Sequence, residues 1–278
     1  MATLATIAPF GFSDLNPRTL LPLYRQLGCT TLQYYRNTRN PPRLEEVTAL
    51  ANDLGMAFDS IHGVFGPEHD PSSPDEPTRQ FAMRTYREEG ELCLKLGGAG
   101  VVVHPAPMAI DPSILTERTW QIRVDPMRRS IEQLARIGEK LGVVYLIENI
   151  PGNYYFGADP VLLARMIRVM NSKWVRMCFD TGHANMTSRS SPDKDLEACL
   201  DVTTYLHVND NDGQIDSHLF PGAGTCPWDS YATQIAKLPD ETPAMLELFY
   251  SEEEIKLQIA AGLAEKLAKW MGTGVKSF

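Results

Sequence analysis

Residues 142–149 read Gly-Val-Val-Tyr-Leu-Ile-Glu-Asn, and this stretch sets a pattern that the rest of the chain repeats. Five apolar residues, Val143 to Ile147, follow a glycine and end at the acid Glu148. A short run that stays apolar at every position is typical of a strand covered on both faces in a parallel sheet. The stretch therefore predicts a buried parallel strand with an ionisable residue at its carboxyl end.

Similar runs recur along the chain, separated by longer segments in which apolar residues have helical spacing. We expect strands over Ala5–Phe10, Thr30–Tyr35, Ala57–His62, Gly100–Pro105, Val143–Glu148, Trp174–Asp180, Tyr205–Asn209 and Ala244–Phe249. We expect helices over Pro17–Leu27, Arg43–Leu54, Asp75–Leu96, Pro126–Leu141, Asp159–Met170, Asp193–Leu200, Trp228–Leu238 and Glu252–Trp270.

This alternation of eight strands with eight helices, at about 35 residues per pair, predicts a single (β/α)8 TIM barrel over residues 1–278. An open doubly wound sheet is the rival architecture. Such sheets usually carry a G-x-G-x-x-G phosphate turn after the first strand, and Phe10-Gly11-Phe12-Ser13 lacks it. The barrel is therefore the favoured fold class.

Charge and hydropathy narrow the range of partners. The chain has 278 residues, and 26 Lys and Arg against 35 Asp and Glu give a formal net charge of −9. Nucleic acid is not an expected partner, because its non-specific affinity comes mainly from Lys and Arg contacts to phosphates. No run approaches the ~18 apolar residues of a membrane span, so we expect no membrane contact. An acidic surface with scattered apolar residues is compatible with a homo-oligomer.

The cysteines and the first residues indicate the compartment. The five cysteines are an odd number without C-x-x-C spacing, which fits neither a closed disulfide framework nor a thiolate zinc knuckle. No Lys or Arg precedes Arg18, so the basic start of a secretory signal is missing. We therefore expect a reducing, cytoplasmic location, and we interpret Cys178, beside the end of the sixth strand, as a packing residue.

Six consecutive expected strands end in ionisable side chains, on the face where TIM barrels build their active sites. These residues are His62, His104, Glu148, Asp180, His207 and Glu247. One such residue alone is more often structural, but four from successive strands of a closed ring can converge on one point. We therefore predict a divalent metal site formed by Glu148, Asp180, His207 and Glu247. Three carboxylates and one imidazole suit Mn²⁺, Co²⁺ or Mg²⁺ and also tolerate Zn²⁺.

Other polar residues extend this predicted site. His183 lies three residues after Asp180 across a Thr-Gly turn, and an Asp-x-His pair follows the seventh strand. The candidates for additional metal ligands or substrate contacts are His62, His104, His183, Asp216 and His218. Arg36 and Trp228 are candidate substrate-binding residues, the first through forked hydrogen bonds and the second by stacking on a sugar. A surface charge and a core aromatic are the respective alternatives.

With these residues the chain resembles the xylose isomerase-like barrels, which include sugar phosphate isomerases and epimerases, inosose dehydratases and endonuclease IV. The motifs are Ile147-Glu148-Asn149, Phe179-Asp180-Thr181-Gly182-His183, His207-Val208-Asn209-Asp210, Asp216-Ser217-His218 with Pro221-Gly222-Ala223-Gly224, and Leu246-Glu247-Leu248. In the epimerase branch the resemblance implies one divalent ion on Glu148, Asp180, His207 and Glu247. It also implies that the two glutamates act as catalytic residues that move protons and that His183 touches substrate. The implied activity is isomerisation or epimerisation of a sugar or sugar phosphate through an enediolate, in carbohydrate metabolism.

One departure from the epimerases concerns the substrate. Ketohexose epimerases resemble one another in an arginine six residues after the histidine of the seventh strand, and here that position is Gly213, which argues against a free ketohexose.

Three other functions stay open. A metal-dependent lyase or dehydratase of a keto-cyclitol or keto-sugar needs the same proton removal. Positions matching the trinuclear zinc site of endonuclease IV are all present, so two or three Zn²⁺ ions and phosphodiester hydrolysis are a further alternative, which the acidic charge disfavours. A non-catalytic sugar-binding barrel would not need two glutamates beside a metal.

Overall fold

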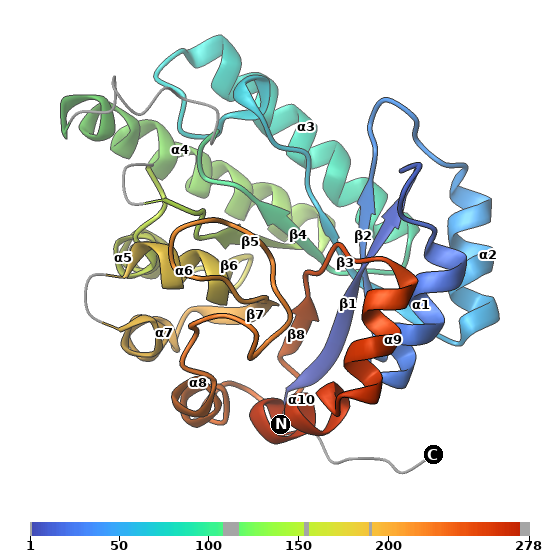
Figure 1. Ribbon diagram of the computed structural model, residues 1–278. Coiled ribbons are helices and arrows are strands. Elements are labelled where there is room, and N and C mark those ends of the chain that lie inside the picture. The colour runs from blue at the N-terminus through green and yellow to red at the C-terminus, as the bar shows by residue number, and fades with distance from the viewer. Residues whose placement is uncertain (1, 108–116, 153–155, 189–190, 273–278) are drawn as a thin grey trace.

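The computed structural model describes residues 2–107, 117–152, 156–188 and 191–272. Its strands close into one barrel in which sequence neighbours pair in parallel and β8 pairs with β1 (Figure 1). The strands are β1 (Thr3–Phe10), β2 (Thr31–Arg36), β3 (Ala57–His62), β4 (Gly100–Val103), β5 (Val144–Glu148), β6 (Val175–Asp180), β7 (Thr203–Val208) and β8 (Pro243–Leu246). The predicted (β/α)8 TIM barrel is confirmed.

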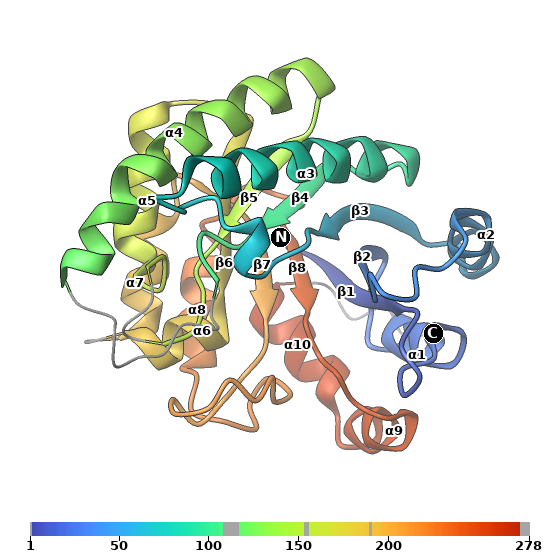
Figure 2. The same cartoon turned by 90° about the horizontal axis from the view of Figure 1, so that it is seen from above.

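Helices surround the barrel, as Figure 2 shows from a second direction. They are α1 (Pro17–Gln26), α2 (Leu44–Leu54), α3 (Glu76–Lys95), α4 (Glu117–Leu141), α5 (Pro160–Met170), α6 (Thr181–Thr187), α7 (Pro192–Cys199), α8 (Trp228–Ile235), α9 (Glu252–Ala260) and α10 (Leu263–Met271), with a 3₁₀ turn η1 (Pro67–His69). Side-chain caps fix several starts; the Asp75 carboxylate, for example, accepts the Thr78 N–H at the start of α3. Within the described ranges, no helix has the length and apolar character needed to cross a membrane.

Three elements differ from the expectation. The last helix is divided into α9 and α10, because Gly262 adopts a left-handed conformation (φ 79°) between them. The helix expected from Pro126 already begins at Glu117 and contains Pro126. The Thr-Gly turn expected after Asp180 is instead the start of α6, because the Asp180 side chain caps that helix by accepting the His183 N–H at 2.6 Å.

Apolar side chains form the core in two parts. One large cluster packs the outer faces of the strands against the helices. A smaller cluster fills the barrel itself and consists of Ala5, Ile7, Val102, Leu146, Cys178, Tyr205 and Met245. Ionisable residues occupy the carboxyl ends of the strands beyond this inner cluster, so they lie on an apolar floor.

Candidate metal centre

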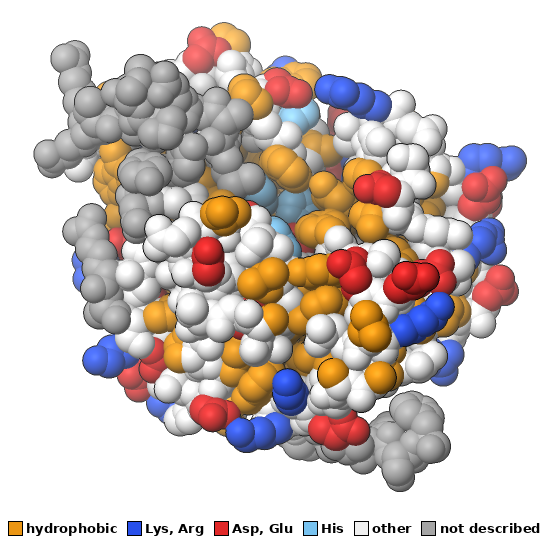
Figure 3. Space-filling model, in the orientation of Figure 1, with side chains coloured by type: hydrophobic (Ala, Val, Ile, Leu, Met, Phe, Trp, Pro, Cys, Tyr) orange, Lys and Arg blue, Asp and Glu red, His pale blue; other side chains and the backbone are white. Residues whose placement is uncertain are grey.

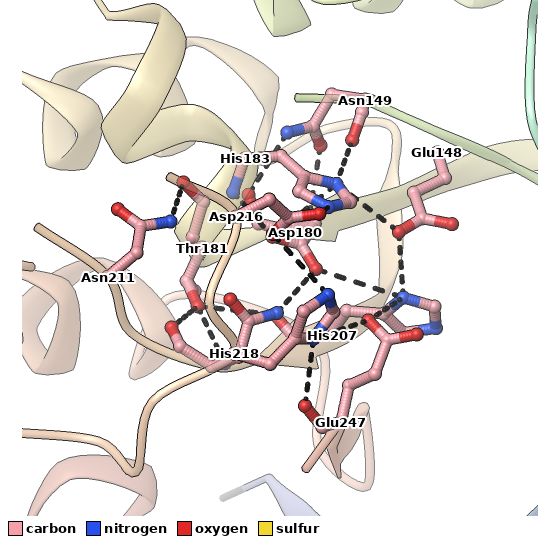
Figure 4. Close-up of polar contacts among 12 residues, drawn as sticks. Glu148, Asn149, Asp180, Thr181, His183, His207, Asn211, Asp216, His218 and Glu247 are labelled. Atoms are coloured by element: carbon pink, nitrogen blue, oxygen red, sulfur yellow. Dashed lines mark hydrogen bonds and ion pairs between the residues drawn. The ribbon is translucent and has the colours of Figure 1, made fainter. Parts of the chain in front are cut away.

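The nine ionisable residues predicted for the site lie together at the carboxyl ends of the strands and in the segments that follow them. Figure 4 labels all of them except His62 and His104. The nine residues form three groups in which candidate ligand atoms lie within 4.8 Å of one another: Glu148, Asp180, His207 and Glu247; His62, His104 and Glu148; and His183, Asp216 and His218. Figure 3 shows histidine side chains in a hollow of this face, with hydrophobic side chains around it. Glu148 belongs to two groups and therefore joins them.

The first group surrounds one nitrogen of His207. From His207 Nδ1, Glu148 Oε1 lies at 2.8 Å, Glu247 Oε2 at 3.1 Å and Asp180 Oδ2 at 3.9 Å. Glu148, Asp180 and His207 lie within β5, β6 and β7, and Glu247 directly follows β8. All four side chains are buried. Closure of the barrel thus brings three acids and one imidazole from four neighbouring strands to one point.

The second group approaches Glu148 from the other side of the barrel. His104, directly after β4, places Nε2 at 3.2 Å from Glu148 Oε2. His62, at the end of β3, places Nε2 at 3.8 Å from the same oxygen and at 3.9 Å from Glu247 Oε1. Glu148 therefore presents Oε1 to His207 and Oε2 to two further histidines, which is an arrangement suited to bridging two ions.

The third group comes from α6 and from the loop between β7 and α8. Asp216 lies between two imidazoles, with Oδ2 at 3.4 Å from His183 Nε2 and Oδ1 at 3.3 Å from His218 Nε2. His183 Nδ1 lies 3.5 Å from Glu148 Oε1. The third group therefore adjoins the first.

Backbone carbonyls orient three of these imidazoles. The Nδ1 atoms of His62, His183 and His218 contact the carbonyl oxygens of Gly63, Asn149 and Glu247 at 2.9, 2.7 and 3.0 Å. A carbonyl only accepts, so each Nδ1 carries a proton, and Nε2 is the nitrogen that can offer a lone pair to an ion once it has lost its own proton. A hydrogen bond of this kind is usual for histidines that bind metals, because it fixes both the tautomer and the ring direction.

Unpaired carboxylate oxygens give an independent test of whether the residues fit a cation. Glu148 Oε2, Glu247 Oε2 and Asp216 Oδ1 are buried and each has an imidazole nitrogen nearby, at 3.2, 3.1 and 3.3 Å, but none accepts a hydrogen bond of good geometry within the part of the chain that the structure describes. A buried polar atom without a partner is costly unless a water, an ion or a ligand satisfies it. One such oxygen lies in each of the three groups, so the donor set fits divalent ions.

Burial and neighbouring charges shift the pKa values of the ionisable residues in the site. Burial, together with the Glu247 and Glu148 carboxylates, raises the pKa of Asp180. Burial alone would also raise the pKa of Glu148, but the His207 and His104 imidazoles hold it well below its usual value. Burial opposes protonation of His218, yet the Asp216 and Glu247 carboxylates beside it raise its pKa to about 9. Protonated imidazoles thus balance the carboxylates, and ion binding would release protons.

Two asparagines and a glycine position Asp180. Asn149 brackets its backbone: the amide donates to the Asp180 carbonyl at 3.0 Å and accepts the Asp180 N–H at 2.9 Å. Asn209 donates to Asp180 Oδ2 at 2.8 Å. A Cβ at Gly182 would lie 1.9 Å from the Asn209 Oδ1 atom, so only glycine allows this approach. The sequence motifs contain these residues, but their spacing alone does not reveal what they support.

Asp210 holds the loop that carries the third group. Its buried carboxylate accepts the N–H groups of Asn211, Gly222 and Cys226 at 2.9, 2.9 and 3.0 Å. Trp228 Nε1 donates a fourth bond at 2.8 Å, and the indole is buried. This corrects the expectation that Trp228 stacks on a substrate, because the indole belongs to the core and anchors Asp210.

Arg36 lies at the edge of a cavity of about 470 Å³ next to the metal centre. Its guanidinium forms a two-pronged ion pair with Glu89 of α3, in which the Nη1 bond is 3.1 Å long. The loops after β1, β2 and β3 line the cavity, and His62 is shared between the cavity and the metal centre. Arg36 therefore forms part of the wall, with its charge already balanced.

Solved structures with the same fold come from sugar epimerases, among others. The structure of a D-tagatose 3-epimerase-like protein superimposes with a TM-score of 0.75 and 20% identity, covering 96% of this chain and 100% of that one. For 3-keto-D-glucoside 4-epimerase, YcjR, from E. coli the TM-score is 0.72, with 19% identity and coverage of 99% and 100%. For the TTHB071 protein of Thermus thermophilus, from a crystal soaked with ZnCl2, the TM-score is 0.66 at 24% identity, covering 95% of this chain and 98% of that one.

Curated relatives and a family model complete the comparison. Uncharacterized protein MJ1311 of Methanocaldococcus jannaschii is 27% identical over 168 residues, which are 59% of this chain and 55% of that protein. Uncharacterized protein y4fM of Sinorhizobium fredii is 27% identical over 173 residues, 61% and 53% of the two chains. The chain thus spans about half the length of these two relatives. The family model described as xylose isomerase-like TIM barrel matches residues 21–272, and the chain belongs to this family.

Proposed function

We propose that this protein is a divalent-metal-dependent sugar isomerase or epimerase of the cytoplasm in which Glu148 and Glu247 move a proton next to a substrate carbonyl. The observation that carries the proposal is the placement of these two glutamates. One oxygen of each lies close to His207 Nδ1, at 2.8 and 3.1 Å, while the second oxygen of each points elsewhere. The names of the structurally similar epimerases support the same reaction class.

Glu148, Asp180, His207 and Glu247 would hold the ion, with His207 contributing Nδ1. When bound, the ion would supply Lewis-acid stabilisation of negative charge on a carbonyl and its neighbouring hydroxyl. His183, which lies beside this group, would contact substrate or a further ion.

The second oxygens of the two glutamates indicate where the proton moves. Glu148 Oε2 and Glu247 Oε1 both face His62 Nε2, at 3.8 and 3.9 Å. A substrate carbon held between them would lose its proton to one carboxylate and regain a proton from the other, on the opposite face. Reprotonation of the same carbon inverts its configuration, and reprotonation of the neighbouring carbon of the enediolate moves the carbonyl.

The cavity beside His62 would hold the rest of the substrate. Phe12 and Tyr35 stack at 5.2 Å in its lining, and Phe65, which is 41% exposed, stacks at 4.6 Å on His104. Aromatic faces at the mouth of a polar site suit the C–H faces of a sugar, while Arg36 and its neighbours offer hydrogen-bond donors at the wall.

One observation favours a second candidate function. Three groups of candidate ligands, two of them joined by Glu148, could hold up to three ions. Such a centre would suit hydrolysis of a phosphoester, because several ions can stabilise both the attacking and the leaving oxygen.

The deciding experiment is a metal analysis of protein purified without chelator, with Glu148→Gln and Glu247→Gln beside it. Exposed Glu139 on α4 supplies the control variant, Glu139→Gln. We then expect keto-sugars to exchange a carbon-bound proton with deuterated water, measured by NMR, in the wild type and the control but not in the Glu247→Gln variant.

Each outcome discriminates between the candidates. About one ion per chain and deuterium exchange without loss of water from the sugar support the isomerase or epimerase. Exchange followed by release of a β-substituent would point to a lyase. Two or three zinc ions with cleavage of a phosphodiester substrate would favour the hydrolase, and a chain that binds no ion would refute the mechanism.

A further inference from the structure

Tyr35 lies at the carboxyl end of β2 and faces the inside of the barrel. Two residues before it, Gln33 donates to Ser60 Oγ at 3.1 Å, and Ser60 in turn bonds the Tyr205 hydroxyl within the barrel. Residues two apart on a strand point to the same side, so Tyr35 lies one layer above Gln33, and it packs against the inner apolar cluster. Strand β2 therefore supplies an inward-facing phenol where the strands from β3 to β8 supply the ionisable residues of the site.

Three ring contacts place Tyr35 between the metal centre and the cavity beside His62. The centre of its ring lies 5.4 Å from that of His62, edge to face, and 5.9 Å from that of Phe249, two residues after Glu247. Phe12 stacks on the tyrosine at 5.2 Å, and Phe12, Tyr35 and His62 all line the cavity. Since Glu247 Oε1 lies 3.9 Å from His62 Nε2, this glutamate oxygen and Tyr35 lie against the same imidazole.

The hydroxyl of Tyr35 is available to a ligand. Five other tyrosines are buried and donate to a backbone carbonyl or, in one case, to the Asp59 carboxylate: Tyr24, Tyr86, Tyr145, Tyr205 and Tyr231. The Tyr35 hydroxyl forms no hydrogen bond with any residue that the structure describes, and it is not a buried atom. Burial of the residue and the Glu247 carboxylate raise the pKa of Tyr35, so the hydroxyl stays protonated and can donate.

The charges around Tyr35 favour an uncharged partner for this hydroxyl. Arg36, the next residue, is held by Glu89, and the exposed Arg39 and Glu68 of the cavity lining have opposite charges. A phenol donates one hydrogen bond and accepts others without carrying a charge of its own. Such a group suits a sugar hydroxyl.

We propose that Tyr35 is a substrate-binding residue whose hydroxyl bonds a hydroxyl of the sugar beyond the carbonyl and neighbouring hydroxyl that the ion would hold. The inference rests on the proposed function and adds the contribution of β2, which no ionisable motif indicates. A site built to bond a substrate hydroxyl discriminates against an analogue that lacks this group. Tyr35 would therefore select sugars that carry a hydroxyl at this position.

The test uses two tyrosine variants from the same strand. Tyr35→Phe removes only the hydroxyl and keeps the ring with its packing. Tyr34→Phe is the control, because Tyr34 belongs to the outer core, where its ring contacts Phe10 and Phe58. Metal analysis of both variants checks that the ion is retained.

The probes isolate the hydroxyl that Tyr35 would bond. They are D-xylulose and D-ribulose with the 4-deoxy and 5-deoxy forms of each, because C4 and C5 carry the hydroxyls beyond the carbonyl and its neighbours. Deuterium exchange by the Mn²⁺-loaded proteins, followed by NMR, gives kcat/KM for each probe. Calorimetry with xylitol, which has no carbonyl and does not react, measures binding without turnover.

We expect Tyr35→Phe to lower kcat/KM for the pentuloses about 2- to 12-fold, the net effect of one uncharged hydrogen bond, and to weaken xylitol binding by a similar factor. On either the 4-deoxy or the 5-deoxy form, the wild type and the variant should react equally, because the hydroxyl that Tyr35 bonds is then missing. Tyr34→Phe should match the wild type with every probe.

Equal kcat/KM values of the wild type and Tyr35→Phe on both pentuloses, with equal xylitol binding, would overturn the inference and leave the proposed function standing. A loss of the same size on each pentulose and on both of its deoxy forms would also overturn it, since the hydroxyl would then act through packing. Loss of the ion from Tyr35→Phe would overturn it in favour of a role in the metal centre. If the wild type neither exchanges a proton of any probe nor binds xylitol, the proposed function and this inference fail together.

Discussion

Asp210 is not a candidate ligand, yet replacing it with asparagine should remove one ion site selectively. Each of its oxygens accepts two hydrogen bonds: Oδ1 from the N–H groups of Asn211 and Cys226, and Oδ2 from Gly222 N and Trp228 Nε1. An amide keeps only one accepting oxygen, so Asp210→Asn leaves two donors facing an NH₂ group: both are buried if the NH₂ replaces Oδ1, and one of them, the Gly222 N–H, is exposed if it replaces Oδ2.

The magnitude follows from these contacts. A buried donor left without an acceptor costs about 1–3 kcal/mol, and the exposed Gly222 N–H can bond water, so the Asp210→Asn change should lower the free energy of unfolding by at least about 1–3 kcal/mol. Trp228→Phe removes one donor while Oδ2 keeps its bond from Gly222, so it should cost about 0.5–1.5 kcal/mol, the net worth of one hydrogen bond. The matched control is Asp212→Asn, because both bonds of that exposed carboxylate, from the Gln214 and Ile215 N–H groups, go to Oδ1 and survive in the amide.

Urea unfolding of the metal-free variants, followed by circular dichroism, measures these differences. Zinc titration then measures the functional consequence, since the loop that Asp210 holds carries Asp216 and His218. We expect Asp210→Asn to lose the ion of the third group and to keep the one bound with Glu148. The reasoning would be refuted by an unfolding free energy within about 0.5 kcal/mol of the control, or by an equal loss of every ion.

Three further results are expected. Glu148→Gln should abolish ion binding by both groups that share this residue and leave the third group loaded, which metal analysis of the purified variant checks. Removal of a bound ion with chelator should lower stability by about 2.7 kcal/mol relative to protein at a free ion concentration 100 times Kd, measured by urea unfolding; equal curves would contradict a specific site. Burial raises the pKa of Asp59, so the native carboxyl keeps a proton that the unfolded chain has lost; the stability of the wild type relative to Asp59→Asn should therefore fall as pH rises from about 4 toward that raised pKa, and a difference that stays constant with pH would disprove this.

The residues that the sequence does and does not reveal differ in how local their signals are. A strand such as Val144–Glu148 can be predicted from its own composition. Once the strands form a barrel, the polar residue at its carboxyl end must lie on the active-site face. The positions of the candidate ligands at the strand ends could be predicted for that reason. The capping of α6 by Asp180 also depends on neighbouring residues only. The Thr-Gly pair after Asp180 predicts a turn, but the hydrogen bond from the His183 N–H to the Asp180 carboxylate stabilises a helix start instead.

Long-range pairings explain the rest. Arg36 and Glu89 are 53 residues apart, and nothing in the sequence around either residue indicates that the two form an ion pair. Trp228 follows a glycine-rich loop, and on that ground it was a candidate for stacking on a substrate. Its hydrogen-bond partner Asp210 precedes the loop by many residues, so the spacing does not reveal the pair. Such contacts depend on which side chains the closed barrel brings together, and the spacing of residues along the sequence does not predict this.

The pairing of the arginines also bears on what the site accepts. Arg36 is held by Glu89, and Arg123 of α4 is held by Asp70 at 2.6 Å, so two cations near the mouth are neutralised within the chain. In the cavity lining the exposed Arg39 and Glu68 carry opposite charges, so together they add no net positive charge. A polyanion such as a nucleic acid gains its affinity from many unpaired cations, which this lining does not offer. A small polyhydroxyl substrate instead needs hydrogen-bond partners and aromatic faces, and the cavity beside His62 supplies both, which is why the same ligand set favours a sugar over a phosphodiester.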